Sequence, residues 1–235
     1  MFDGFKDSSE VQELVENGNK EISQSSQYLF DKLMGDAPFG KADNESDEFG
    51  NNDYEFIIKD LYEEVYGRDE DDFSFEKFDL SNPELNDSLM VFSDDKWESL
   101  DTYEKKLALV NYEKKLSKVL DLRNPPKIEF FQGKPRECGS YDRRNNIIRV
   151  NETHLNDTKL IVNTIAHETW HAYQYQCAEN PKTRQDMLYA INFKKYVSPI
   201  EYEGKWLLFD EYESQLVEAE ARAFGNLLAD KVGVR

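Results

Sequence analysis

The chain has 235 residues, of which 39% are hydrophobic and 13% aromatic, and its formal net charge at pH 7 is −19. Residues 1–100 hold 28 acidic and 8 basic side chains, whereas residues 101–235 hold 20 and 21. The acidic first part would repel phosphate groups, so we expect no nucleic acid among the partners. The length supports one sizeable core with a smaller appendage.

The composition predicts a protein of a reducing compartment. Two cysteines, Cys138 and Cys177, are too few for a disulfide framework. No run of 18 apolar residues occurs, so we expect no membrane-spanning segment and no membrane partner. The start, MFDGFKDSSE, has neither a basic region nor an apolar stretch, which predicts a cytoplasmic location. Export by a non-classical route stays open.

Residues 1–100 predict an acidic, mainly helical region. The stretch 9–34 begins with a capping box and carries apolar residues at helical spacing. Residues 35–53 are rich in Gly, Asp, Asn and Pro and predict a flexible linker. Apolar positions in 54–66 indicate a short helix, whereas 68–98 give no definite secondary structure. We expect this region to pack against the rest of the chain around its cleft and to limit access.

Residues 101–235 predict a body of the α+β class, a compact domain with a small antiparallel sheet. Two prolines end its first helix, and Asn156 and Asp157 are good N-caps for the helix that follows the strands. The expected elements, in chain order, are a helix at about 100–122, strands at 127–131 and 147–151, the helix after Asp157, and helices at about 184–197 and 210–232.

Residues 167–171, His-Glu-Thr-Trp-His, carry the clearest chemical signal in the chain. His167 and His171 are four residues apart, so on a helix both project from one face and can share one metal ion. Imidazole nitrogen suits Zn²⁺, and a catalytic zinc site keeps three protein ligands and one water. Glu168 would face the cleft and could take a proton from that water. The competing interpretations are two ordinary helix histidines, or a metal site without catalysis.

A third protein ligand must come from outside this motif, and two candidates lie near it in the chain. Cys177 follows His167 by ten residues, the spacing at which metzincins place their last histidine. No helix breaker occurs in residues 172–176, so a continuing helix would carry Cys177 about 9 Å beyond His171. His154, the only other histidine, precedes the helix in a loop and stays a candidate.

Two further candidates lie in the stretch LVEAEARAFGNLLA near the end of the chain. Glu218 would complete a ligand set of two histidines and one glutamate, which is common at catalytic zinc sites. Ala221 and Gly225 share its helix face, and their small size would let this helix approach the HETWH helix closely. Glu220 points about 200° away from Glu218 and would be a surface carboxylate unless the helix were rotated. Glu218 is therefore the predicted third ligand.

The two motifs together resemble a known family. TIAHETWHAYQ followed by LVEAEARAFGNLLA is similar to the zincin metallopeptidases with a glutamate ligand (gluzincin-like), and within them to the compact ImmA/IrrE-type group. In that group HExxH is followed by a Glu-x-x-Ala-x-x-Phe-(Ala/Gly) helix, which residues 218–225 match. The resemblance covers about residues 125–232. Arg222 stands where thermolysin-like enzymes place an aspartate, so the groups that support the histidines are not assigned.

The resemblance implies a zinc-dependent hydrolase of a peptide or protein substrate on a zincin-like fold, with Glu168 as the general base. Glu168 would take a proton from the attacking water and return it to the leaving amine. The strand at 147–151 would lie at the sheet edge beside the cleft, where an extended peptide could pair with it. Four phenols near the motifs could stabilise the oxyanion, and all four stay candidates: Tyr173, Tyr175, Tyr202 and Tyr212.

Two other classes of function stay open. A non-catalytic, zinc-stabilised binding or regulatory module would use the same three ligands and fill the fourth metal position with a protein group. A delivered effector would use its N-terminal helices as a targeting region. A Glu168→Gln variant that keeps its metal but loses turnover would favour the peptidase over the module.

Overall fold

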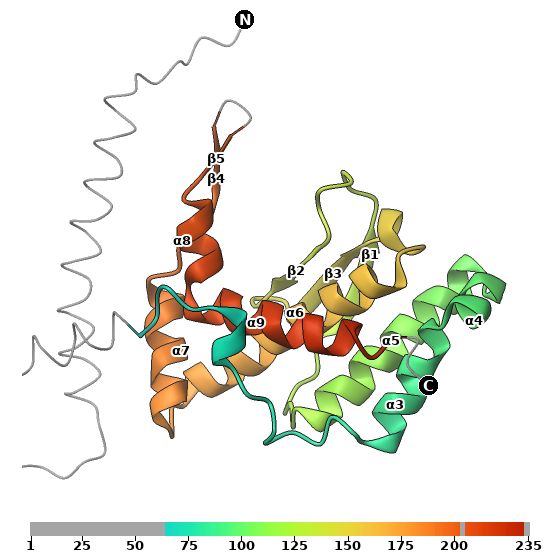
Figure 1. The fold of residues 1–235 in the computed structure, drawn as a ribbon, viewed down its shortest axis with the longest axis horizontal. Helices are drawn as coiled ribbons and strands as arrows, with labels where there is room; N and C mark the ends of the chain where they lie inside the picture. Colours follow the sequence, from blue (N-terminus) through green and yellow to red (C-terminus); the bar gives the residue numbers. More distant parts are fainter. Residues whose placement is uncertain (1–63, 203–204, 233–235) are drawn as a thin grey trace, which may run out of the picture. The chain divides into compact units, whose positions relative to one another are not determined.

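The structure is a computed structural model that describes residues 64–202 and 205–232 (Figure 1). The chain divides into two compact units, residues 1–61 and 62–235. Both motifs lie in the second unit. Its described residues form a mixed α and β body with seven α-helices, a three-stranded sheet and a two-stranded hairpin.

Several expectations for the N-terminal region fall outside the described residues. These are the helix at 9–34, the linker at 35–53 and nearly all of the helix at 54–66. The predicted boundary at residue 100 and the packing of the acidic region around the cleft stay predictions as well. In the two ranges that are described, no helix combines the length and the apolar character needed to cross a membrane.

Residues 64–100 share the core of the second unit. Asn82 caps a short helix by accepting hydrogen bonds from two backbone N–H groups of its first turn, and Pro83 fits the first position, where no N–H is needed. The indole N–H of Trp97 donates to the carbonyl of Leu155 over 2.6 Å, which ties this stretch to the rest of the body. The elements here, which the sequence did not predict, are η1 (Glu70–Asp72), α3 (Pro83–Leu89), η2 (Met90–Phe92) and α4 (Asp94–Ser99).

The helix expected at about 100–122 is confirmed as α5 (Thr102–Val119). Its start is a capping box in which Asp101 accepts from the backbone N–H of Glu104 and Glu104 accepts from that of Asp101. Three side chains on one face of this helix are fully buried: Leu109, Tyr112 and Leu116.

A three-stranded sheet comes next, with its strands in the order β1-β3-β2. The strands are β1 (Lys127–Phe131), β2 (Gly139–Asp142) and β3 (Ile147–Asn151). β2 and β3 pair antiparallel, but β1 and β3 pair in parallel, so the expectation of a purely antiparallel sheet is wrong. After β1 the chain crosses to the far edge to form β2, and β3 then returns into the gap and runs in the direction of β1. The central strand is therefore β3, and its Ile148 and Val150 are buried.

The motif helix is α6 (Thr158–Glu179), and Asp157 caps it as predicted by accepting from the backbone N–H of Leu160. The expectation of one continuous helix at 210–232 is wrong. Gln215 has an extended backbone, with φ −73° and ψ 144°, and divides this stretch into two helices. The remaining elements are η3 (Glu152–His154), α7 (Arg184–Lys194), β4 (Ile200–Tyr202), β5 (Lys205–Leu207), α8 (Phe209–Ser214) and α9 (Leu216–Ala229).

Helix α9 packs along α6, and this pair forms the centre of the core (Figure 1). At Gly225 a Cβ atom would lie 3.0 to 3.1 Å from atoms of Asn163 on α6, so the small-residue face predicted for α9 is confirmed as a close approach. The rings of Trp170 and Phe224 pack across the two helices with their centroids 4.3 Å apart. The sheet contacts α6 through β2 and β3. α6 therefore contacts α9 and the sheet at once.

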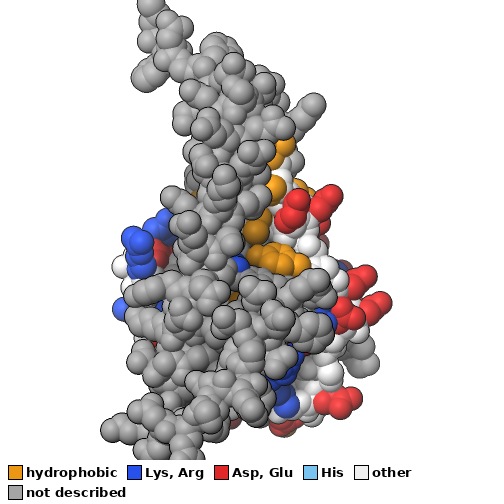
Figure 2. All heavy atoms as spheres, turned by 90° about the vertical axis from the view of Figure 1, so that its left-hand side faces the viewer, with side chains coloured by type: hydrophobic (Ala, Val, Ile, Leu, Met, Phe, Trp, Pro, Cys, Tyr) orange, Lys and Arg blue, Asp and Glu red, His pale blue; other side chains and the backbone are white. Residues whose placement is uncertain are grey.

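The hairpin β4–β5 is joined to the body at its base by a side-chain clamp. The amide nitrogen of Gln215 donates to the carbonyls of Val197 and Tyr212, and its amide oxygen accepts from the N–H of Val197 and the side chain of Asn192. Figure 2 views this side of the molecule and shows hydrophobic side chains gathered on its described face. The large hydrophobic residues that are exposed on α7, the hairpin and α8 include Met187, Ile200, Leu207 and Phe209. These hydrogen bonds hold the two ends of the connection between α7 and α8 together.

Candidate metal centre

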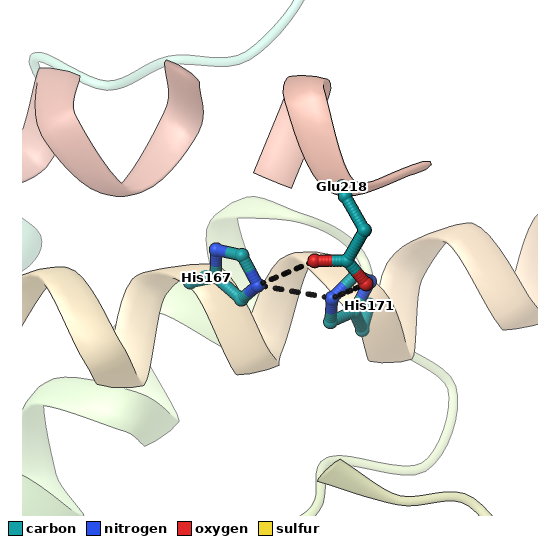
Figure 3. Close-up of side chains that lie close together, drawn as sticks. All are labelled: His167, His171 and Glu218. Atoms are coloured by element: carbon teal, nitrogen blue, oxygen red, sulfur yellow. Dashed lines mark hydrogen bonds and ion pairs between the residues drawn. The ribbon is translucent and has the colours of Figure 1, made fainter. Parts of the chain in front are cut away.

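His167, His171 and Glu218 meet in one cluster where α6 and α9 pack together (Figure 3). The histidines lie one turn apart on α6, and their Nε2 atoms are 3.1 Å from each other. The carboxylate oxygens of Glu218 lie 3.4 Å from Nε2 of His167 and 3.3 Å from Nε2 of His171. Within the described part of the chain, this is the one group of three or more His, Cys, Asp or Glu side chains close enough to hold a metal ion. The structure thus brings together the three predicted ligands.

The spacing and the environment of these atoms fit a metal ion. In a tetrahedral zinc site with bonds of about 2.0–2.1 Å, neighbouring donor atoms are about 3.3 Å apart, close to the separations found here. Oε2 of Glu218 is buried and has no hydrogen-bond partner among the described residues. A buried carboxylate oxygen needs a partner, and a cation among these donors would supply one. Two imidazoles and a carboxylate suit Zn²⁺ and several other divalent transition-metal ions.

Gln174 fixes the orientation of His171. Its amide nitrogen donates to the carbonyl of Val217 over 3.1 Å and to the carboxylate of Glu220 over 2.9 Å, so its amide oxygen is the acceptor. That oxygen lies 2.9 Å from Nδ1 of His171, and Nδ1 therefore carries the proton. A neutral His171 then presents the lone pair of Nε2 to the metal position. No motif marks Gln174, and its one sequence signal is a polar residue three positions after His171.

Glu220 supports this arrangement from inside the protein. It is only 7% exposed, so its interpretation as a surface carboxylate is wrong. Its Oε2 accepts hydrogen bonds from the indole N–H of Trp170 over 3.0 Å and from Gln174. Burial raises the pKa of its carboxyl group, and these hydrogen bonds oppose the rise. Glu220 lies outside the candidate metal-binding cluster, and Glu218 is the carboxylate within that cluster.

Glu168 lies in the same cleft as the three candidate ligands. The cleft has a volume of about 250 Å³, and Glu168 is buried in its wall. The backbone N–H of Tyr141 donates to the carboxylate. Burial raises the pKa of Glu168, and the nearby histidines His167 and His171 oppose this rise. A carboxylate with a raised pKa beside a candidate metal position suits proton transfer.

Strand β2 forms the wall of the cleft opposite α9, and Gly139 allows it to approach α6. A Cβ atom at this position would lie 2.6 Å from Cγ2 of Thr164 and 2.7 Å from the carbonyl oxygen of Arg149. Real Cβ atoms do not approach other atoms so closely. A glycine is therefore required for β2 to lie against the motif helix.

The free edge of the sheet at the cleft belongs to β2, and the expectation that residues 147–151 form this edge is wrong. β3 is the central strand, with partners on both sides. The N–H of Asn151 donates to the carbonyl of Cys138, which sets the alternation of the β2–β3 ladder. By that alternation the backbone groups of Gly139 and Tyr141 point away from β3, toward the open edge.

The charges of His171 and Glu218 depend on each other. Burial disfavours the charged form of His171, but the Glu218 carboxylate more than offsets this and raises the pKa of His171 to about 9. Burial likewise disfavours the charged form of Glu218, and the two imidazoles nevertheless hold the pKa of its carboxyl well below the usual value. A metal ion that bound at this site would therefore displace a proton from His171.

Two phenols lie beside Glu218 in the cleft. The hydroxyl of Tyr196 donates to Oε1 of Glu218 over 2.5 Å, and the hydroxyl of Tyr212 interacts with both Glu218 and Tyr196. Burial raises the pKa of both phenols, so both stay protonated at neutral pH. Tyr196 was not among the predicted phenols, because it comes after α7 and is remote in sequence from both motifs.

The four predicted phenols have different positions. Tyr212 and Tyr175 line the cleft. Tyr173 packs against Trp170 and Phe78 instead, with ring centroids 4.9 and 5.3 Å away. The side chain of Tyr202 lies outside the described residues. Tyr212 and the unpredicted Tyr196 are the phenols that contact a candidate ligand.

The other candidate ligands lie elsewhere. α6 continues without a break past Cys177, whose thiol interacts with Tyr173 and Asp186. His154 lies in η3, with its Nε2 atom 3.2 Å from the carbonyl oxygen of Glu137. Neither residue belongs to the metal-binding cluster.

Comparison with known proteins gives no match to a family model, to a curated protein or to a solved structure. The residues of the cleft are therefore the basis on which a function is assigned.

Proposed function

We propose that the protein is a zinc-dependent metallopeptidase with the ligand set of the glutamate-type zincins that its two motifs resemble. One observation carries this proposal: two imidazoles and a carboxylate converge in a cleft that also holds a second carboxylate, Glu168, outside the ligand set. Structural zinc sites are closed by four protein ligands. The described residues supply three, which leaves room for a water or a substrate atom.

His167, His171 and Glu218 would hold the zinc ion, which when bound supplies Lewis acidity and a water of lowered pKa. Glu168 takes a proton from the attacking water and returns it to the leaving amine. Gln174 holds His171 in the tautomer that ligates through Nε2. The hydroxyls of Tyr196 and Tyr212 are protonated donors in the same cleft and can stabilise the oxyanion of the tetrahedral intermediate.

The substrate that suits this cleft is an extended peptide. Among the described strands, β2 lies at the edge of the sheet beside the cleft. The backbone N–H and carbonyl of Gly139 and the carbonyl of Tyr141 point toward this edge, whereas the N–H of Tyr141 donates to Glu168. A peptide that pairs with this edge gains main-chain hydrogen bonds regardless of its side chains. The same pairing would run the peptide past Glu168 and the metal position, which share the cleft with β2.

The test measures bound zinc and peptide turnover in the same preparations. Glu168→Gln keeps the size of the side chain but removes the base, so we expect zinc binding to persist while turnover falls by about 10²–10⁴-fold. Glu98→Gln on α4, an exposed site, is the matched control and should keep both. A zinc-loaded parent chain that cleaves no peptide in a broad library, or undiminished turnover in Glu168→Gln, would show the proposal to be wrong.

A non-catalytic metal module is the second candidate, and the position of Tyr196 favours it. Its hydroxyl lies 2.5 Å from a ligand oxygen and could fill the fourth metal position, which would exclude water. In that case Tyr196→Phe would weaken metal binding. For the peptidase we expect Tyr196→Phe to reduce turnover more than metal affinity.

A further inference from the structure

A second hollow adjoins the metal cleft. It has a volume of about 310 Å³, and Tyr141 and Tyr175 line both spaces, so their side chains form the partition between them. Its other walls come from the segment after α5, the turn between β2 and β3, and the last turns of α6. An extended peptide paired with β2 would leave the metal cleft past Tyr141 and reach this hollow.

Three charged side chains line the hollow: Arg123, Arg143 and Glu179. The Glu179 carboxylate lies 3.8 Å from a guanidinium nitrogen of each arginine, which is beyond hydrogen-bond distance. All three side chains are more than half exposed, so these ion pairs are weak. The hollow therefore carries one excess positive charge, with Glu179 only loosely engaged.

Arg143 is held in place by aromatic packing. Its guanidinium carbon lies 4.6 Å from the centroid of the Tyr175 ring. Tyr175 in turn stacks on Phe193, with centroids 3.6 Å apart and planes 10° from parallel, and Phe193 lines the metal cleft. A guanidinium that lies over an aromatic ring can still donate its N–H groups to a carboxylate through two parallel hydrogen bonds. The contact with the ring restricts the Arg143 side chain, so less of its conformational entropy is lost on binding than for a side chain without such a contact.

We propose that this hollow is a substrate subsite that binds a carboxylate of the peptide through Arg143, with Arg123 adding positive charge. The carboxylate belongs either to an acidic side chain or to the C-terminus of the peptide. This inference rests on the proposed peptidase function and names its substrate class. The substrates are peptides in which a carboxylate lies in the hollow beside Arg143 while the bond to be cleaved lies in the metal cleft.

The test uses matched peptides and the zinc-loaded full chain. The peptides share one cleaved bond and are compared in pairs. In each pair, one position flanking that bond is Glu in one peptide and Gln in the other. A further pair differs only in its C-terminus, which is free in one peptide and amidated in the other. At one position, or at the C-terminus, we expect the carboxylate to raise kcat/KM by about tenfold or more. The ratio for that pair should fall toward one in Arg143→Gln. It should persist in Arg144→Gln, a neighbouring arginine that does not line the hollow.

A binding measurement separates this inference from the peptidase proposal. Fluorescence anisotropy of the same peptides with zinc-loaded Glu168→Gln reports affinity without turnover. Cleavage without any carboxylate preference, or a preference unchanged in Arg143→Gln, would overturn the subsite and leave the peptidase standing. Binding that depends on the carboxylate and on Arg143, without turnover in the parent, would keep the subsite and overturn the peptidase. No turnover and no such binding would overturn both.

Discussion

Nδ1 of His171 lies 2.9 Å from the side-chain oxygen of Gln174, and this contact joins the candidate metal centre to the buried carboxylate of Glu220. We predict that Gln174→Leu lowers zinc affinity by about 10–100-fold, because His171 loses the acceptor that sets its tautomer and ring orientation. Titration against a competing chelator measures the effect, with circular dichroism as a check on folding. Gln176→Leu, on the same helix but outside the metal cleft, should bind zinc like the parent. Equal affinities for both variants would show that Gln174 has no positioning role.

The choice of the third ligand gives a second prediction. Glu218→Ala removes the carboxylate that faces both histidines, so we expect zinc stoichiometry to fall from one per chain to near zero at equimolar zinc. Cys177→Ala should leave it at one, because the thiol lies outside the cluster. Zinc retained in the first variant and lost in the second would reverse the ligand assignment.

Gly139 gives a prediction about the cleft wall. Gly139→Ala places a methyl group 2.7 Å from the carbonyl oxygen of Arg149, which is backbone and cannot move aside easily. We expect a loss of about 1–3 kcal/mol in the free energy of unfolding. Denaturant unfolding measures this, with Ser140→Ala on the same strand as the control. If Gly139→Ala is as stable as Ser140→Ala, β2 does not approach α6 as closely as described.

The position of the motif helix and its ligands depends on local signals. Asp157 supplies the cap of α6, and the four-residue spacing places His167 and His171 on one face. Helix geometry also separates Glu218 from Glu220, because residues two apart point in nearly opposite directions. These features depend on a few consecutive residues, and for that reason they could be predicted.

The features that were not predicted depend on contacts between distant segments. Gln174 acts through Val217 and Glu220, which lie 43 and 46 residues further along the chain. Tyr196 reaches Glu218 only because the chain returns after the β4–β5 hairpin. The parallel pairing of β1 with β3 depends on the crossing of the loop between β1 and β2, which hydrophobic periodicity does not encode.

Glu113 on α5 predicts a pH dependence of stability that is independent of the metal site. Burial raises the pKa of its carboxyl from 4.5 to about 7, although the Ser117 hydroxyl donates to it. The folded state therefore keeps this proton at pH values where the unfolded state has lost it. The free energy of unfolding should fall as pH rises from about 4.5 to about 7, by about 3 kcal/mol from this group.

The comparison of the parent with Glu113→Gln isolates this contribution from other titrating groups. At pH 8 the variant should be the more stable by up to about 3 kcal/mol, and near pH 4 the difference should vanish. Urea unfolding across this range gives the two curves. Curves that stay parallel at all pH values would contradict a buried, proton-binding Glu113.

The most direct test of the metal centre is anomalous X-ray diffraction at the zinc absorption edge from crystals of the zinc-loaded full chain. We predict one strong anomalous peak at about 2.0–2.2 Å from Nε2 of His167, Nε2 of His171 and a carboxylate oxygen of Glu218, with a fourth position open to the cleft. A peak at Cys177 or His154, or a crystal from zinc-containing solution with no peak between α6 and α9, would contradict it.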